Sequence, residues 1–175
     1  ELIKLATENN RQAQQQIYTH FSPKMLGVCR QYIKDIHQAE DIMITAFMKV
    51  FVNIKNFENK GSFEGWIRRI MVNECISFIR VQKKIKYVED ETYFEESFNN
   101  IESQFSTDDI QSLIDSLPDG YKTVFNLYAI EGFKHKEIAS MLEINEGTSK
   151  SQLSHARKML QIQINKLKNY EYGTE

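Results

Sequence analysis

The sequence predicts an all-α protein made of two small helical domains joined by an acidic linker. The chain has 175 residues but only two prolines and seven glycines, and residues that favour helices dominate its composition. Apolar side chains recur every three or four positions over most of its length, which is the period of a helix buried on one face. The distribution of charge then divides the chain into three segments.

Charge is arranged in blocks along the chain. Residues 1–88 hold 14 Lys and Arg against 8 Asp and Glu, a net charge of +6. Residues 89–109 hold 8 acidic residues and no basic one, and the rest of the chain is balanced. This pattern predicts a basic domain over 1–88, an acidic linker over 89–109 and a mixed domain over 110–170. The linker is either a solvated tether or a segment whose charge mimics nucleic acid and occupies a basic channel.

Four helices are expected in the first domain. Residues 1–21 fit one helix, and Ser22 with Pro23 is expected to start a second that runs to about residue 33. Asp35 can cap a third helix over about 36–53, with Gln38 placed to complete a capping box. The core stripe of that helix is expected to be Ile42, Met43, Ala46, Phe47, Val50, Phe51 and Ile54.

The stretch 54–86 is the most informative part of the first domain. A polar loop over 56–62 leads into a helix that ends near residue 86 and carries the single tryptophan, Trp66, which we expect in the core. A second face of this helix presents Arg69, Asn73, Ser77, Arg80 and Lys84 at helical spacing. A cationic strip with hydrogen-bonding side chains is suited to bind a polyanion that also presents hydrogen-bonding edges for recognition.

Residues 134–160 fit a helix-turn-helix. Helices are expected from 107 or 108 to 117, over 121–130 and over 134–142, with a turn at 118–120 and Gly132 ending the second. Asn145 can cap a last long helix that opens with small and polar residues, where Gly147 lets the backbone approach a phosphate. Gln152 can pair with adenine, whereas Arg157 suits phosphates. An ordinary helical hairpin with a solvated polar face is the alternative.

No enzyme, metal, cofactor or membrane function is indicated. The histidines are scattered without metal-ligand spacing to a cysteine, and no glycine-rich phosphate loop occurs. Cys29 and Cys75 fall on apolar helical faces and are expected to be buried free thiols of a reducing compartment. Neither a run of eighteen apolar residues nor a signal-peptide pattern is present, so we expect a cytoplasmic protein without membrane insertion.

With both stretches in view, the chain resembles bacterial RNA polymerase sigma factors of the sigma-70 family, in the small extracytoplasmic-function group. The segment 39–42 (Ala-Glu-Asp-Ile), with Phe47, Lys49 and Phe51, is similar to the region 2.2 helix that binds core polymerase. The pattern of the family's regions 2.3 and 2.4 is matched in this chain by Phe57, Gly61, Phe63, Trp66, Ile67, Ile70, Asn73 and Arg80. The pattern of region 4 is matched by Leu117-Pro118, Phe125, Gly132, Glu137-Ile138-Ala139, Leu142, Gly147-Thr148, Lys150-Ser151, Leu153, Ala156-Arg157 and Leu160.

The resemblance implies a promoter-directed function with three sets of residues. Recognition and melting of the minus-ten element are expected from Asn56, Asn59, Lys60, Arg69, Asn73, Arg80, Lys83 and Lys84. Contacts to the minus-thirty-five element are expected from Thr148, Ser149, Lys150, Ser151, Gln152, His155, Arg157 and Lys158. Core polymerase is expected to contact Asp35, Glu40, Asp41, Thr45 and Lys49. The implied partners are promoter DNA, bacterial core RNA polymerase and, as is common in this group, an anti-sigma factor.

Two departures from the family pattern bear on these expectations. Ile44 and Thr45 stand where the family has glutamine followed by an acid, which replaces a polar contact to polymerase with an apolar side chain. Gln152 and His155 stand where arginine is common, which we interpret as a changed base preference. The main alternative is a stand-alone helix-turn-helix regulator that binds duplex DNA without polymerase. A sigma-like protein that has lost core binding is the third.

Overall fold

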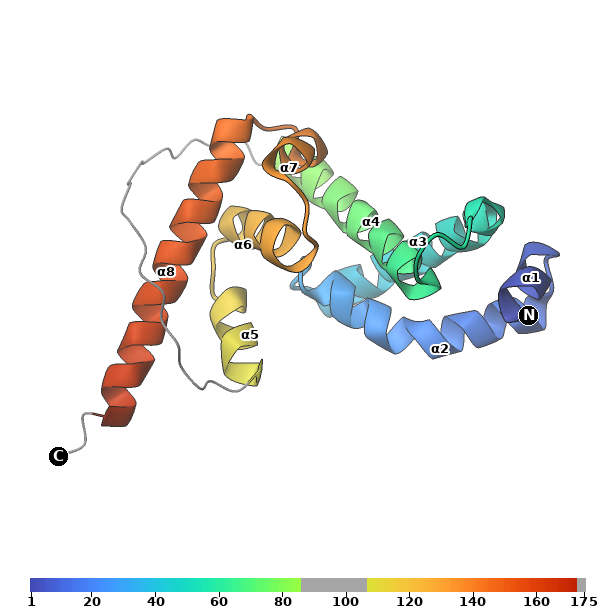
Figure 1. Cartoon of the computed structure of the whole chain (residues 1–175), viewed down its shortest axis with the longest axis horizontal. Coiled ribbons are helices and arrows are strands. Elements are labelled where there is room, and N and C mark those ends of the chain that lie inside the picture. Colours follow the sequence, from blue (N-terminus) through green and yellow to red (C-terminus); the bar gives the residue numbers. More distant parts are fainter. Residues whose placement is uncertain (86–106, 173–175) are drawn as a thin grey trace. The chain divides into compact units, whose positions relative to one another are not determined.

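The fold consists of helices in two units, residues 1–87 and 88–175, each of which is described by itself (Figure 1). A computed structural model describes residues 1–85 and 107–172. Over those ranges the chain is helical and forms no β-strand, which confirms the all-α prediction. The predicted acidic linker therefore lies almost wholly outside the described residues. None of the helices in the described ranges combines the length and apolar character needed to cross a bilayer.

The first 30 residues form two helices, α1 (Leu2–Thr7) and α2 (Arg11–Arg30). Asn9 adopts the left-handed conformation with φ of 61°, which asparagine tolerates better than most residues. Asn10 then caps α2, because its side-chain oxygen accepts a hydrogen bond from the Ala13 N–H at 3.0 Å. The single helix predicted for residues 1–21 is therefore wrong.

The helix start predicted at Ser22 and Pro23 is also wrong, because α2 continues through both residues. Met25, Val28 and Cys29 extend the buried face that begins at Ala13 and Ile17. Burying one large apolar side chain stabilises a fold by about 1.5–3 kcal/mol, so several of them offset the roughly 3 kcal/mol cost of an interior proline. Local sequence signals alone do not include this stabilisation, because it comes from contacts with other helices.

Helices α3 (Ile36–Asn53) and α4 (Phe63–Ile85) complete the first unit, joined by the short 3-10 helix η1 (Ile54–Asn56) and a loop. Asp35 caps α3 as expected, with its carboxylate accepting a hydrogen bond from the Gln38 N–H at 2.8 Å. The predicted core stripe of α3 is buried except for Phe51, which is half-buried. Both α2 and α3 pack against α4, which places the buried face of α4 at the centre of this unit.

The two cysteines meet in this core. Cys29 on α2 and Cys75 on α4 are free and have no exposed surface, which confirms the prediction of buried thiols. The two thiols are hydrogen-bonded to each other, and that bond together with burial raises the pKa of the Cys75 thiol. These groups are therefore part of the packing between α2 and α4.

The second unit contains α5 (Thr107–Asp115), α6 (Asp119–Phe125), α7 (His135–Leu142) and α8 (Glu146–Tyr172). A five-residue π-helix, η2 (Asn126–Ile130), continues α6 in place of the regular helix that was predicted for 121–130. Gly132 ends this segment with φ of 76°, as predicted. The turn between α7 and α8 uses Glu143, which takes the left-handed conformation usually given to glycine.

Candidate nucleic-acid and polymerase interfaces

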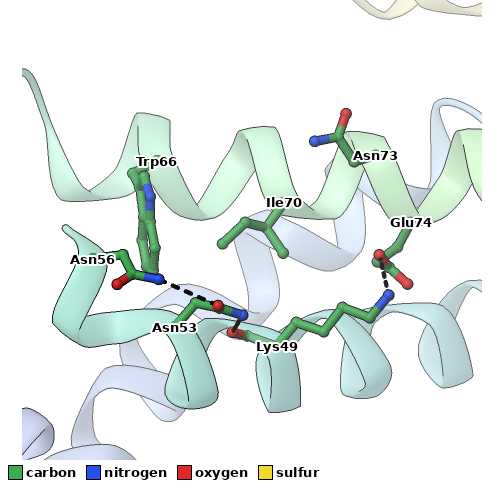
Figure 2. Close-up of a pocket in the computed structure, with 7 residues that line it drawn as sticks. All are labelled: Lys49, Asn53, Asn56, Trp66, Ile70, Asn73 and Glu74. Carbon is green, nitrogen blue, oxygen red and sulfur yellow. Dashed lines mark hydrogen bonds and ion pairs between the residues drawn. The ribbon is translucent and has the colours of Figure 1, made fainter. Parts of the chain in front are cut away.

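An open pocket of about 320 Å³ lies between α3 and α4 in the first unit (Figure 2). Trp66 and Ile70 project from α4 toward α3 and form its apolar part. The polar lining comes from Lys49, Asn53, Asn56, Asn73 and Glu74. This volume is at the lower end of the 300–1,000 Å³ that is typical of small-ligand sites. The pocket therefore offers one flat aromatic group together with several amide donors and acceptors.

The asparagine side chains of this pocket differ in the hydrogen bonds that they already make within the protein. Asn53 donates to the backbone oxygen of Lys49 at 2.8 Å and accepts a longer bond of 3.4 Å from Asn56. Asn73 is exposed, and its carboxamide has no hydrogen-bond partner among the residues that the structure describes. Asn73 is therefore the amide most available to an incoming ligand.

An ion pair closes one side of the pocket. The Nζ of Lys49 lies 2.6 Å from the Oε1 of Glu74, and Figure 2 shows the lysine stem running along α3 to reach it. The side chain of Glu74 is only 14% exposed, whereas that of Lys49 is 54% exposed. The lysine can therefore turn toward solvent or an anion, while the carboxylate stays in place.

The structure brings together only part of the predicted minus-ten set. Asn56 and Asn73 line the pocket, and the exposed side chain of Arg69 lies outside its lining. Arg80 is half-buried, with its Nε atom inaccessible to solvent. In the loop, Lys60 pairs with Glu58 at 2.6 Å, and Asn59 takes the left-handed conformation. Lys83 and Lys84 belong to α4, but their side chains lie outside the described residues.

An aromatic cluster supports the loop and the pocket wall. Trp66 stacks on Phe63 at 5.7 Å between ring centroids and tilts against Phe57 at 5.6 Å, while Phe63 also meets Phe21 of α2. All four rings are half-buried. Trp66 was expected in the core, but one side of its indole faces the pocket. Asn53 and Glu74 were missed as pocket residues, because only the packing of α3 on α4 places them beside the indole.

The outer face of α3 carries an apolar stripe that opposes its buried stripe. Ile44, Met48 and Val52, spaced four residues apart, are 48%, 65% and 80% exposed. The predicted polymerase-binding residues Asp35, Asp41, Thr45 and Lys49 are also exposed, and Glu40 is half-buried. Met48 and Val52 were missed, although their spacing from Ile44 on a helix with a second apolar face could have revealed them.

The helix-turn-helix is formed by α7 and α8. Some residues that were predicted to meet DNA are engaged within the protein: Ser149 is fully buried, and the ring of His155 stacks on Tyr121 at 5.4 Å. The Oε1 of Gln152 is buried without a hydrogen-bond partner, and a Cβ at Gly120 would lie 3.4 Å from it.

Other predicted residues of α8 are more accessible. Lys150 and Arg157 are exposed, while Thr148, Ser151 and Lys158 are half-buried. Lys150 pairs with Glu146 one turn earlier at 2.7 Å, and this hydrogen-bonded pair lowers the pKa of the Glu146 carboxyl. Lys150 near the start of α8 and Arg157 further along it are thus two exposed cations on one helix, and such cations favour contact with phosphate.

Comparison with known proteins matches both units in order. Residues 17–85 match the family described as sigma-70 region 2, and residues 107–160 match sigma-70 region 4. The RNA polymerase sigma factor SigV of Bacillus subtilis is 33% identical over 135 residues, which cover 77% of this chain and 81% of that protein. The extracytoplasmic-function sigma factor SigW of the same organism is 30% identical over 94% of this chain and 96% of its own.

A solved structure supports the fold. The sigma factor RpoE of Bartonella quintana, in complex with the anti-sigma factor NepR, aligns with a TM-score of 0.50 and 20% sequence identity. The alignment covers 86% of this chain and 96% of that one.

Proposed function

Because this chain belongs to the sigma-70 family of RNA polymerase sigma factors, in its extracytoplasmic-function group, we infer that it binds core RNA polymerase and directs it to promoters. Region 2 occupies the first unit and region 4 the second. A stand-alone helix-turn-helix regulator is not favoured, since it would leave the region 2 match without a role. The proposed function assigns no catalytic step to this chain, and it places the chain in the cytoplasm beside the polymerase.

The pocket between α3 and α4 is the observation that carries the strand-opening step. A base turned out of the duplex loses a few kcal/mol of stacking and pairing, and stacking on an aromatic side chain returns about 1–3 kcal/mol. Trp66 supplies the aromatic surface, and the carboxamides of Asn56 and Asn73 can meet the hydrogen-bonding edge of the base. Lys49, which the family resemblance assigned to core polymerase, lines this pocket, and its exposed ammonium group is proposed to contact a backbone phosphate of the strand.

The first turns of α8 are proposed to read the upstream element. Lys150, Arg157 and Lys158 supply charge for phosphates, and Thr148 supplies a small hydroxyl donor for base edges. The hydroxyl of Ser151 donates to the backbone oxygen of Thr148 at 3.0 Å, so it can serve a base edge as an acceptor. Each site contacts only a few nucleotides. The two DNA sites are on one chain, so binding at one raises the effective concentration of DNA at the other, and two weak sites together can bind a promoter tightly.

The outer face of α3 is proposed to dock on core polymerase. An exposed apolar stripe flanked by Asp41 and Thr45 has the composition of an interface core with a polar rim. An anti-sigma protein is proposed as a second partner, because the structurally similar sigma factor RpoE was solved in complex with the anti-sigma factor NepR.

Strand opening can be tested on holoenzyme assembled from this chain and bacterial core polymerase. Open-complex formation is measured by permanganate reactivity on a template that the holoenzyme selects from random duplexes. Asn56→Ala and Asn73→Ala should lower the open fraction without lowering core affinity. Asn165→Ala changes an exposed asparagine of α8 and serves as the matched control. Unchanged opening with Asn56→Ala and Asn73→Ala would contradict the assignment of this site.

A further inference from the structure

Side chains from both helices of the helix-turn-helix meet on one tyrosine. His135, the first residue of α7, stacks on Tyr128 of η2 with ring centroids 4.6 Å apart and 24° between the rings. The guanidinium carbon of Arg157, on α8, lies 5.6 Å from the centre of the same ring. Tyr128 therefore contacts both His135 at the start of α7 and the exposed Arg157 of α8.

His135 also reaches the first turn of α8 directly. Its Nδ1 lies 2.9 Å from the Oγ of Ser149, whose side chain has no exposed surface. A buried hydroxyl without a partner is costly, so this bond explains why a polar residue is tolerated there. His135 thus contacts both η2 and the start of α8, the two elements on either side of its own helix.

We propose that His135 is a positioning residue for recognition of the upstream promoter element. Its bond to Ser149 fixes α7 against the first turn of α8, and its stack on Tyr128 holds the ring against which Arg157 lies. A guanidinium that is already held in place loses less side-chain entropy when it binds a phosphate. The inference rests on the proposed function, because it assigns the network to promoter binding.

The surroundings of His135 favour a neutral imidazole. Burial is the main reason that the pKa of His135 is lowered from its ordinary value of 6.5, and the positive charges of Lys150 and Arg157 add to it. Glu146 opposes them, and exposed Lys136 follows on the same helix. A neutral ring can donate or accept at Nδ1, so either tautomer permits the bond to the Ser149 hydroxyl.

Two substitutions separate the hydrogen bond from the stack. His135→Phe keeps a ring against Tyr128 and removes the bond to Ser149. His135→Asn keeps a polar atom near the position of Nδ1 and removes the ring. His20→Asn, at an exposed histidine of α2, is the matched control because it lies in the other unit.

The test compares two templates with holoenzyme of the full chain and bacterial core polymerase. One template is selected by the wild-type holoenzyme from random duplexes, and the other is the same duplex with its upstream element scrambled. Each His135 variant should lower affinity about three- to tenfold on the intact template, the range expected for one lost hydrogen bond or stack, and not on the scrambled one. His20→Asn should match wild type on both.

Three results would overturn the proposal. Variants that bind the intact template like wild type would show that His135 has no positioning role. An equal loss on both templates would show a general effect on folding or on core binding. A wild-type chain that forms no complex with any selected template would overturn the proposed function, and the inference about His135 with it.

Discussion

Lys49 of α3 and Glu74 of α4 form an ion pair of 2.6 Å along one side of the region 2 pocket. Since the lysine is half exposed, the pair contributes only about 0–1 kcal/mol to folding. Under the proposed function the pair matters more for DNA binding, because Glu74 and a DNA phosphate would compete for the same cation. We therefore expect Glu74 to control how readily Lys49 can contact the strand.

Removing this competition should strengthen strand binding. Glu74→Gln should raise open-complex affinity severalfold, and Lys49→Gln should lower it and reduce the slope of log affinity against log salt by about 0.7. The slope is measured by titrating holoenzyme on a selected template between low and moderate salt. Glu64→Gln is the control, because Glu64 pairs with Lys24 away from the pocket lining. An unchanged salt slope for Lys49→Gln would exclude a phosphate contact.

A charge placed in the apolar stripe of α3 should weaken polymerase binding. Met48→Lys should lower affinity for core polymerase at least tenfold by fluorescence anisotropy, since a buried unpaired ammonium is costly at an interface. The thermal unfolding midpoint should stay unchanged, because Met48 is 65% exposed in the free chain. Val81→Lys is the control at an α4 position of similar exposure, 60%. Equal losses for Met48→Lys and Val81→Lys would contradict docking through α3.

Stability of the second unit should fall with acidity through His135. The folded pKa of His135 is below its ordinary value of 6.5, so the unfolded chain binds the proton more tightly. Unfolding therefore becomes easier as pH falls below about 6.5, and this group contributes no pH dependence above that range. The test is the urea midpoint of the Leu153 methyl signals between pH 5.5 and 7.5. His135→Phe should flatten the profile relative to wild type, and parallel profiles would contradict the assignment.

The buried thiols should be protected from reagents in the native chain. Cys29 and Cys75 have no exposed surface, and the pKa of the Cys75 thiol is raised by its bond to Cys29 and by burial. N-ethylmaleimide at pH 8 should label neither residue until the first unit unfolds. Labelling is followed by mass spectrometry with and without denaturant. Rapid labelling of the native chain would show that α2 and α4 separate readily.

Features that depend on local spacing could be predicted from the sequence. The buried stripe of α3, its Asp35 cap, the left-handed Gly132 and the helix-turn-helix all follow from periodicity and capping chemistry. The family resemblance, carried by side chains in both units, identified the sigma-70 family correctly. Each of these signals can be read from the order of residues along the chain, so no knowledge of packing between helices was needed.

Features that depend on contacts between helices could not be predicted. Pro23 stays inside α2 because residues on both sides of it bury the same face. Asn53 and Glu74 become pocket residues only when α3 packs on α4. Likewise, His155 is engaged by Tyr121 of α6, and Ser149 by His135 of α7. A one-dimensional pattern gives the face of a side chain but not its neighbour on another element.

The proposed function is that this chain makes core polymerase specific for a promoter. Run-off transcription with bacterial core polymerase, with and without the chain, on a template selected by the assembled holoenzyme tests this function most directly. We expect a discrete transcript only when the chain is present, and little duplex binding by the chain alone. Tight, specific duplex binding without polymerase and no chain-dependent transcript would contradict it.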